Sequence, residues 1–321
     1  MAPEAARPAT AVAHPNLALV KYWGKADAER NLSATPSLGI SLAALRSRVQ
    51  VRLDGDGDSV ELDGRRLDAA RYRPFLDAVR SRCGTRSGFR IHAHNDFPSA
   101  AGLASSSSGF AALAAACSAA CGAELPDDEL SELARMGSAS AARAVFGGFV
   151  SLPAGAEAAR PLVPAEAWPE LRVVVAVVTA AAKPIGSREA MERVRRTSPA
   201  YASWVADSPG LYREAVAAVR DRDLPRLGVA MRKSYSRMFA TMLAADPPIR
   251  YWLPETLVLL AAVEKLREQG VAAWETMDAG PQVKVLCLDG DAQRVAAALA
   301  AACPAAPPLV SAVGAGVVRG G

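Results

Sequence analysis

The spacing of apolar residues predicts strands in the first third of the chain. Residues 17–23, 48–53 and 88–94 are short runs rich in aliphatic and aromatic side chains, and the second run alternates between apolar and polar positions. Turn dipeptides at 57–58 and 63–64 separate further short strands. We therefore expect an antiparallel β-region near the start of the protein.

Helical spacing of apolar residues dominates the middle of the chain. It predicts helices at 71–83, 105–120, 127–134, 138–145, 188–194, 198–205, 210–221, 224–245, 254–269 and 291–301. The valine-rich run 171–178 instead predicts a central strand, and 272–276 and 283–287 predict two more strands. The two ends of the chain, 1–10 and 314–321, lack such spacing, and we expect them to be disordered or mobile.

This order of strands, helices and again strands indicates an α+β fold. A predicted strand ends just before Lys183 and Pro184, and we place a domain boundary there. The two expected domains are residues 1–183 and 184–321.

Composition and charge exclude several classes of protein. The formal net charge is +4, and lysine and arginine do not cluster, which argues against nucleic-acid binding. The chain has no apolar stretch that could span a bilayer and no apolar leader at its start, so we expect a cytoplasmic protein without a membrane partner. The mild excess of positive charge suits a polyanionic small molecule, although solubility alone also explains it.

The cysteines and histidines show no spacing typical of metal ligands. Cys117 and Cys121 lie four residues apart in an alanine-rich stretch, as small core residues of a helix do. His92 and His94 alternate with apolar residues, which predicts that both lie on one face of a strand. We expect no metal site here, and a reducing compartment suits the five scattered cysteines.

The strongest local feature is a loop of small residues at 98–109, between a predicted strand and a predicted helix. Backbone N–H groups at a helix N-terminus bind anions, and small side chains let a loop close around a phosphate. The loop matches neither of the common glycine-rich nucleotide-binding patterns. A flexible serine linker is the alternative interpretation, and the helix that follows argues against it.

Three further segments combine charged residues with tight turns. Lys21 and Lys25 flank two aromatic residues, and strand alternation would place Tyr22 on the opposite face from both lysines. Arg143 follows a small-residue turn and has the donor geometry for a phosphate. Asp278 lies in a loop between two apolar strands. Each segment alone also fits a structural role, as an exposed strand end, a helix cap or a turn.

Together these segments resemble the diphosphomevalonate decarboxylase family of the GHMP superfamily. The segments are KYWGK (21–25), FPSAAGLASSSSG (97–109), GSASAAR (137–143) and MDAGP (277–281), in the order of that family. The resemblance extends from about residue 13 to residue 288. It implies a GHMP-kinase fold, with a ribosomal-protein-like N-terminal domain, a ferredoxin-like C-terminal domain and an active site in the cleft between them.

The resemblance also implies a role for each matching residue. Asp278 matches the catalytic aspartate, and Lys21 matches the lysine beside the reacting centre. Ser187 and Arg188 match the pair near the substrate carboxylate. The residues that match binders of the substrate diphosphate are Tyr22, Lys25, Ser138, Ser140 and Arg143. Those that match the ATP phosphate loop are Gly102, Ala104, Ser105, Ser106 and Ser107, with Ser106 as the candidate Mg²⁺ ligand.

The implied reaction is ATP-dependent decarboxylation of mevalonate 5-diphosphate to isopentenyl diphosphate, with Mg²⁺, by a homodimer. The chain departs from the family pattern at Thr35, Phe239 and Gln282, among other positions. Three alternatives stay open, and the departures motivate the first of them. They are the same chemistry on mevalonate 5-phosphate or a related 3-hydroxy acid, a kinase that stops at the 3-phosphate, and an ATP-responsive protein without catalysis.

Overall fold

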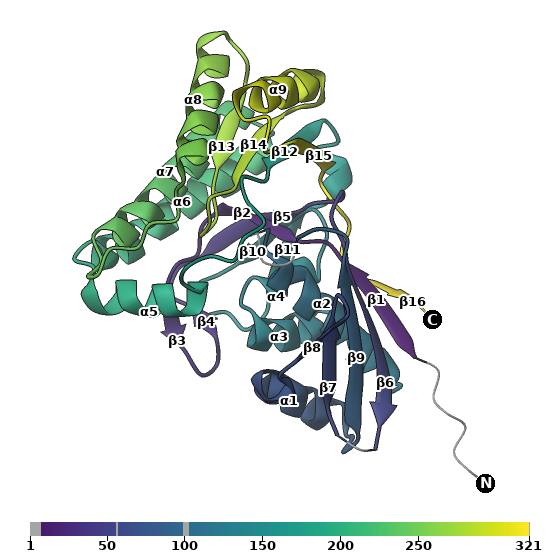
Figure 1. Cartoon of the computed structure of the whole chain (residues 1–321). Helices are drawn as coiled ribbons and strands as arrows, with labels where there is room; N and C mark the ends of the chain where they lie inside the picture. Colours follow the sequence, from purple (N-terminus) through teal and green to yellow (C-terminus); the bar gives the residue numbers. More distant parts are fainter. Residues whose placement is uncertain (1–7, 56, 99–102, 321) are drawn as a thin grey trace.

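The computed structural model describes residues 8–55, 57–98 and 103–320. Figure 1 shows two lobes, one built mainly from the first half of the chain and one mainly from the second half. The fold is mixed α and β, as expected. Helices and strands of both lobes meet at the centre of the molecule, where the short strands of a second sheet lie.

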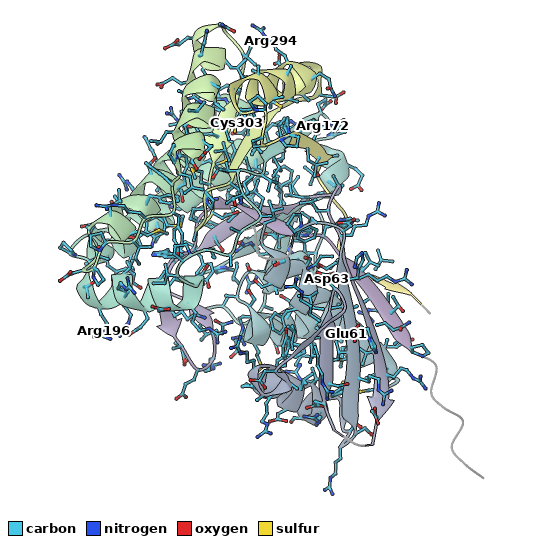
Figure 2. All side chains as sticks on the ribbon, viewed as in Figure 1. Glu61, Asp63, Arg172, Arg196, Arg294 and Cys303 are labelled. Carbon is cyan, nitrogen blue, oxygen red and sulfur yellow. The ribbon has the colours of Figure 1, made fainter. Side chains whose placement is uncertain are left out.

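The N-terminal lobe contains a sheet of six described strands, in the order β16-β1-β6-β9-β7-β8. These strands are β1 (Ala9–Ala13), β6 (Ser47–Asp54), β7 (Ser59–Leu62), β8 (Arg65–Leu67), β9 (Gly88–Asn95) and β16 (Val318–Gly320). Neighbouring strands are antiparallel except for the parallel pair of β7 and β9. One face packs on helices, and the other carries polar residues, among them Glu61 (Figure 2).

Four helices accompany this sheet, namely α1 (Arg73–Cys83), α2 (Ser105–Ala120), α3 (Asp127–Gly137) and α4 (Ala141–Ala144). Helix α2 consists nearly entirely of small residues, and ten of its residues, nine of them small, are buried. Small side chains let a helix approach a sheet closely, so α2 lies against β1 and β6 at the centre of the lobe. This packing holds the N-terminus of α2 in a fixed position.

A second sheet lies between the lobes and has the order β11-β10-β5-β2. Its strands are β2 (Asn16–Val20), β5 (Ser37–Ser41), β10 (Phe149–Leu152) and β11 (Arg160–Val163). A hairpin of β3 (Lys25–Asp27) and β4 (Leu32–Ser33) follows β2. The predicted strand at 17–23 therefore ends early, at Val20, and Lys21 and Tyr22 lie in an irregular segment that strand alternation does not govern.

The C-terminal lobe contains a sheet of order β13-β14-β12-β15. Its strands are β12 (Leu171–Ala176), β13 (Trp274–Thr276), β14 (Val283–Leu288) and β15 (Pro308–Ala312). The helices of this lobe are α5 (Ser187–Thr197), α6 (Tyr201–Asp221), α7 (Leu224–Leu243), α8 (Pro254–Glu268) and α9 (Asp289–Ala302). Charged residues such as Arg196 and Arg294 lie on outer faces of α5 and α9 (Figure 2).

Three sequence-based expectations are wrong. The predicted helices 198–205 and 210–221 form one helix, α6, which continues through Pro209 because its buried face packs on α7. The segment 318–320 is not mobile, because it pairs as β16 with β1. Residues 9 and 10 are not disordered, since they begin β1, and residues 1–7 lie outside the described residues.

The domain division at residue 183 stays a prediction. Strand β12 precedes that residue, yet it pairs with β14 and β15 of the second half, and β16 returns to the sheet of the first half. Strand pairing therefore favours a boundary ahead of Leu171.

The described residues provide neither a metal cluster nor a membrane span. His92 and His94 lie exposed on one face of β9, as predicted, and Cys117 is buried in α2. Throughout the described ranges there is no group of three or more histidine, cysteine or acidic side chains that could hold a metal ion. None of the helices in the described part of the chain has both the length and the apolar character that a bilayer crossing requires.

A buried carboxylate, Glu275 of β13, joins α7, α8 and β13. It accepts hydrogen bonds from Arg232 Nε at 2.7 Å, from the Tyr235 hydroxyl at 3.0 Å and from Arg267. Its side chain is 3% exposed. The three donors compensate the Glu275 carboxylate for its loss of hydration. They also hold β13, which leads to Asp278, against α7 and α8.

We expect Glu275→Ala to lower the free energy of unfolding by about 3 kcal/mol, because it leaves the Arg267 guanidinium partly buried without its carboxylate. Urea unfolding measures the change. Asp207→Ala is the control, since it removes an exposed ion pair with Arg237 and should cost less than about 1 kcal/mol. Equal losses in the two variants would contradict a structural role for the buried cluster.

Candidate active site

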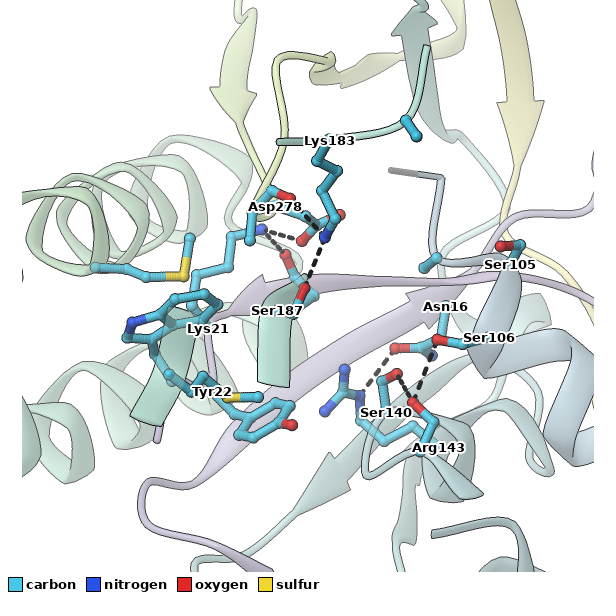
Figure 3. A pocket seen from close by; sticks show the side chains of 18 residues that line it. Asn16, Lys21, Tyr22, Ser105, Ser106, Ser140, Arg143, Lys183, Ser187 and Asp278 are labelled. Carbon is cyan, nitrogen blue, oxygen red and sulfur yellow. Dashed lines mark hydrogen bonds and ion pairs between the residues drawn. The ribbon is translucent and has the colours of Figure 1, made fainter. Parts of the chain in front are cut away.

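A cavity of about 430 Å³ lies where the two lobes meet. Its walls come from the end of β2, the N-terminus of α2, the turn before α4, the start of α5 and the loop after β13 (Figure 3). The lining residues that the sequence predicted for a site are Lys21, Tyr22, Ala104, Ser105, Ser106, Ser138, Ser140, Arg143, Ser187 and Asp278. Folding thus brings together segments that lie as far apart in sequence as residues 21 and 278.

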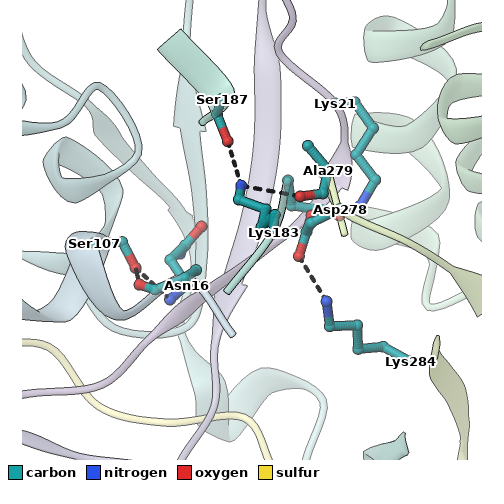
Figure 4. Close-up of polar contacts among 10 residues, drawn as sticks. Asn16, Lys21, Ser107, Lys183, Ser187, Asp278, Ala279 and Lys284 are labelled. Atoms are coloured by element: carbon teal, nitrogen blue, oxygen red, sulfur yellow. Dashed lines mark hydrogen bonds and ion pairs between the residues drawn. The ribbon is translucent and has the colours of Figure 1, made fainter. Parts of the chain in front are cut away.

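Asp278 is held by two ammonium groups, one on each carboxylate oxygen. Lys21 Nζ lies 2.9 Å from Oδ1, and Lys284 Nζ lies 3.1 Å from Oδ2 (Figures 3 and 4). Burial by itself raises the pKa of Asp278, but the two lysines outweigh it, so the pKa falls well below its usual range. The carboxylate therefore stays ionised at neutral pH and keeps one orientation.

Lys21 is buried beside the cavity, with its side chain 2% exposed. Its ammonium group also donates to the Ala18 carbonyl, and its backbone N–H donates to Ser234 Oγ at 2.9 Å. Burial lowers the pKa of Lys21 to about 8, although the charge of Asp278 opposes this shift. A buried ammonium that faces a cavity is a strong binding group for an anion, because little water competes with it.

A third lysine, Lys183, reaches the same wall of the cavity. Its Nζ donates to Ser187 Oγ at 2.6 Å and to the Ala279 carbonyl at 3.0 Å (Figure 4). Its ammonium also lies 5.6 Å from the centre of the Tyr251 ring. Burial lowers the pKa of Lys183. The lysine ties the start of α5 to the loop of Asp278.

Arg143 is buried at the opposite side of the cavity. Its Nε donates to Asn16 Oδ1 at 2.8 Å (Figure 3), and its Nη1 donates to Ser37 Oγ. Burial lowers the pKa of Arg143 to about 10, so the group is still a cation at neutral pH. Gly39 of β5 makes room for this pair, since a Cβ there would lie 2.2 Å from Asn16 Oδ1 and 2.8 Å from Arg143 Nε.

The predicted phosphate-loop serines divide into two groups. Ser106 Oγ faces the cavity and lies 3.3 Å from Ser138 Oγ, which lies 3.1 Å from Ser140 Oγ. The hydroxyl of Ser107 is buried instead, because it accepts from the Asn16 N–H and donates to the Ala104 carbonyl. Ser107 therefore supports the wall rather than lining it, and Gly102 lies outside the described residues.

Lys25 and Arg188 do not line the cavity. The charge of Arg188 acts on both Tyr22, which does line it, and Lys25. Burial, followed by the positive charges of Arg188 and Arg135, lowers the pKa of Lys25 to about 8. Burial raises the pKa of Tyr22 to about 12, against the effect of Arg143 and Arg188, so its hydroxyl stays protonated and can donate. The edge of the cavity thus carries like charges whose repulsion an anionic ligand would relieve.

A smaller and more apolar cavity of about 210 Å³ adjoins the site. It lies between α2 and the sheet of the N-terminal lobe, and it shares Ser105 and Ser106 with the main cavity. Its other walls include Tyr72, Ile91 and Phe110. An aromatic ring would fit its apolar lining.

A divalent cation fits this site only together with the phosphates of a ligand. Mg²⁺ prefers oxygen ligands and takes few from protein when phosphates are present. Ser106 Oγ faces the cavity, while both oxygens of Asp278 already accept from lysines. Ser106 is thus the better placed of the two to contact such a cation.

Sequence reasoning missed Asn16, Lys183 and Lys284. Asn16 begins the apolar strand β2 and Lys284 lies within the apolar strand β14, and nothing in the spacing of either residue marks it. Lys183 precedes a proline after a predicted strand, a position that indicates a boundary rather than a site.

Three departures from the family pattern, at Thr35, Phe239 and Gln282, do not line the cavity. Phe239 packs on Trp252, and Gln282 bonds the backbone of residues 178 and 179. Thr35 accepts a hydrogen bond from the backbone N–H of Trp23, which does line the cavity.

Known proteins match this chain along nearly its whole length. Residues 13–162 match the diphosphomevalonate decarboxylase-like N-terminal domain, and residues 173–314 match the mevalonate 5-diphosphate decarboxylase C-terminal domain. The diphosphomevalonate decarboxylase of Candida albicans is 34% identical over 303 residues, which cover 86% of this chain and 83% of the relative.

Solved structures show the same arrangement of lobes. The mevalonate diphosphate decarboxylase of Staphylococcus aureus is 33% identical and superposes with a TM-score of 0.92 over 98% of each chain. A solved complex with MVAPP, AMPPCP and magnesium is 34% identical and superposes with a TM-score of 0.91, again over 98% of each chain. Because each superposition covers 98% of this chain, it extends over both lobes and the segments that line the cavity.

We expect Lys25→Met to stabilise the protein in the absence of ligand. Below the native pKa of about 8 the wild-type fold holds an ammonium ion that burial and two arginines disfavour, which costs roughly 1 kcal/mol after solvent screening. As the pH rises from 8 towards 10.5, the native state loses this proton before the unfolded state does, so the gain should shrink.

Urea unfolding at pH 7 and at pH 10 measures this gain. Lys265→Met, on the exposed face of α8, is the control and should give no gain at either pH. A gain from Lys25→Met that is equal at both pH values, or a loss at pH 7, would show that the charge of Lys25 is not disfavoured.

Proposed function

Because the chain belongs to the diphosphomevalonate decarboxylase family, we propose that it uses ATP to convert mevalonate 5-diphosphate to isopentenyl diphosphate, ADP, phosphate and CO₂. One observation carries the proposal: an ionised carboxylate, Asp278, faces a cavity whose other walls present buried cations. A substrate with a hydroxyl at one end and a diphosphate at the other would span it. The related complex that contains MVAPP, AMPPCP and magnesium supports this choice of ligands.

The first chemical step is transfer of the ATP γ-phosphoryl group to the substrate 3-hydroxyl. Asp278 accepts a hydrogen bond from this hydroxyl, orients its oxygen towards phosphorus and takes its proton as the new O–P bond forms and ADP leaves. The strongly lowered pKa makes Asp278 a weak base, so its larger contributions are orientation and charge. Phosphoryl transfer has a loose transition state, for which positioning and neutralisation of charge supply most of the catalysis.

Lys21 and the N-terminus of α2 supply positive charge to the transferring group. Lys21 has three N–H donors, and its contacts with Ala18 and Asp278 leave one for a phosphoryl oxygen. A Mg²⁺ ion bound with ATP would neutralise the phosphate oxygens, and Ser106 is our candidate to contact it.

In the second step the new 3-phosphate leaves with the electrons of its C–O bond. The tertiary carbon becomes electron-deficient, the bond to the carboxylate breaks, and its electron pair forms the alkene while CO₂ departs. We assign Ser187 and Arg188 to the substrate carboxylate. Their contacts must orient the carboxylate without stabilising its charge too strongly, because that charge is lost in this step.

The substrate diphosphate supplies binding energy far from the reacting carbon. We assign it to Arg143, Lys25 and Tyr22, with Ser138 and Ser140 as further donors. Relief of the repulsion at the edge of the cavity adds to this binding. Rigid binding of the remote end places the hydroxyl at Asp278, which is how binding energy lowers the barrier.

We assign the ATP phosphates to the N-terminus of α2, from Ala104 to Ser107, and to Gly102. The small apolar cavity beside Ser105 and Ser106 would take the base. Ser107 would contribute only through its support of Asn16 and Ala104, since its hydroxyl is already engaged.

The protein is also proposed to act as a cytoplasmic homodimer in isoprenoid biosynthesis. Five free cysteines suit a reducing compartment. Exposed apolar side chains at the start of α8, namely Leu253, Leu257 and Val258, would suit a contact with a second copy.

We expect Arg143→Ala to raise KM for the diphosphate substrate at least tenfold and to change KM for ATP little, because Arg143 lies on the substrate side of the cavity. Gly39→Ala should have the same direction of effect, since its Cβ would displace Arg143 and Asn16. Steady-state kinetics measure both constants, and Arg196→Ala on the outer face of α5 is the control. An unchanged KM for the diphosphate substrate in Arg143→Ala would show that Arg143 does not bind this substrate.

The proposed function is tested by following ADP and CO₂ together, with Mg-ATP and either mevalonate 5-diphosphate or mevalonate 5-phosphate. We expect one ADP and one CO₂ per diphosphate molecule and little of either from the monophosphate. Turnover of the monophosphate alone would show that mevalonate 5-phosphate is the substrate. ADP without CO₂ would show that the protein is a kinase. Binding of ATP without either product would favour a protein without catalysis.

A further inference from the structure

Lys284 contacts Asp278 from outside the cavity. It lies within β14, where it pairs in register with Val175 of β12 on one side and Thr276 of β13 on the other. Its side chain is 2% exposed, and its Nζ lies 3.1 Å from Asp278 Oδ2 (Figure 4). Lys284 does not line the main cavity, so a ligand held there meets Asp278 rather than Lys284.

Lys21 differs from Lys284 in both respects. It follows the end of β2 in an irregular segment, and it lines the cavity. Its ammonium group shares its donors among the Ala18 carbonyl, Asp278 and any phosphoryl oxygen that binds. A phosphoryl oxygen that accepts from the third donor would share the positive charge of Lys21 with the carboxylate at the moment when the orientation of that carboxylate matters most.

We propose that Lys284 is a positioning residue that holds the Asp278 carboxylate in place and ionised while Lys21 serves the transferring phosphoryl group. The inference rests on the proposed function. Its physical basis is that β14 is hydrogen-bonded on both sides, so the ammonium of Lys284 has a fixed support. A fixed cation on Oδ2 leaves Oδ1 directed at Lys21 and the cavity.

Removal of Lys284 has two consequences for Asp278. The carboxylate loses one of its two close ammonium groups, so its side chain gains rotational freedom. Its pKa also rises, because Lys21 and the more distant Lys183 and Arg143 are then the positive charges that remain. Misplacement of a reacting group by about 1 Å can cost a factor of 10² in rate.

The test is a double-mutant cycle on the rate of ADP and CO₂ formation. Lys284→Met is made in the wild-type protein and in Asp278→Asn, which itself should lower kcat by about 10²–10⁴-fold. In the wild-type background we expect Lys284→Met to lower kcat on the order of 10- to 100-fold, with both KM values nearly unchanged. In the Asp278→Asn background it should change the residual rate by no more than about twofold, because the carboxylate through which it acts is gone.

Leu286→Val is the matched control, because Leu286 lies on the same face of β14 and is fully buried. It should leave kcat unchanged in both backgrounds. An equal fall in the two backgrounds for Lys284→Met, or no fall in the wild type, overturns the inference. Absence of any product from the wild-type protein overturns the proposed function instead.

A second measurement decides the matter if the rate of Asp278→Asn is too low to follow. Lys284→Arg keeps a cation beside Asp278, so its kcat should exceed that of Lys284→Met by about tenfold. Leu286→Val should retain the kcat of the wild type. A kcat of Lys284→Arg that is no higher than that of Lys284→Met overturns the inference.

Discussion

Close approach of several cations around one ionised carboxylate is the constraint on which the rest of this structure depends. Lys21 and Lys284 compensate Asp278, whereas Lys183 and Arg143 add further positive charge to the same cavity. Such an arrangement is unfavourable without a ligand, because burial removes the water that would screen the repulsion. The fold must hold these groups by packing and by neutral hydrogen-bond acceptors, and the ligand must supply the missing negative charge.

Several uncharged residues hold the cations of the site and the N-terminus of α2 in place. Asn16, Ser37 and a glycine at position 39 give Arg143 neutral oxygen acceptors and the space to reach them. The small residues of α2 let the helix N-terminus reach the cavity, and Ser107 fastens that end to Asn16. Each support belongs to a regular element with a buried face, so the cations keep their places although they repel one another.

The charge of Glu275, three residues before Asp278, is fully compensated, in contrast to the charges around the cavity. Two arginines and a tyrosine satisfy its carboxylate, and its cluster faces α7 and α8 rather than a cavity. Full compensation makes that cluster a structural joint, while the incomplete compensation of the cavity makes it a binding site. One strand and its following loop therefore serve both stability and chemistry.

The sequence alone determined the local elements and the residue types of the site. Helical spacing predicted α1, α7 and α8, and short apolar runs predicted β9, β12 and β14, because these patterns depend on neighbours in the chain. The motifs around Lys21, Ser106, Arg143 and Asp278 also indicated the family. Tertiary structure alone decided that α6 continues through Pro209, that β16 closes the first sheet beside β1, and that Ser107 turns inward. It also decided that Lys284 contacts Asp278 from outside the cavity. Side-chain direction and strand pairing depend on contacts between distant segments, and no local periodicity records those contacts.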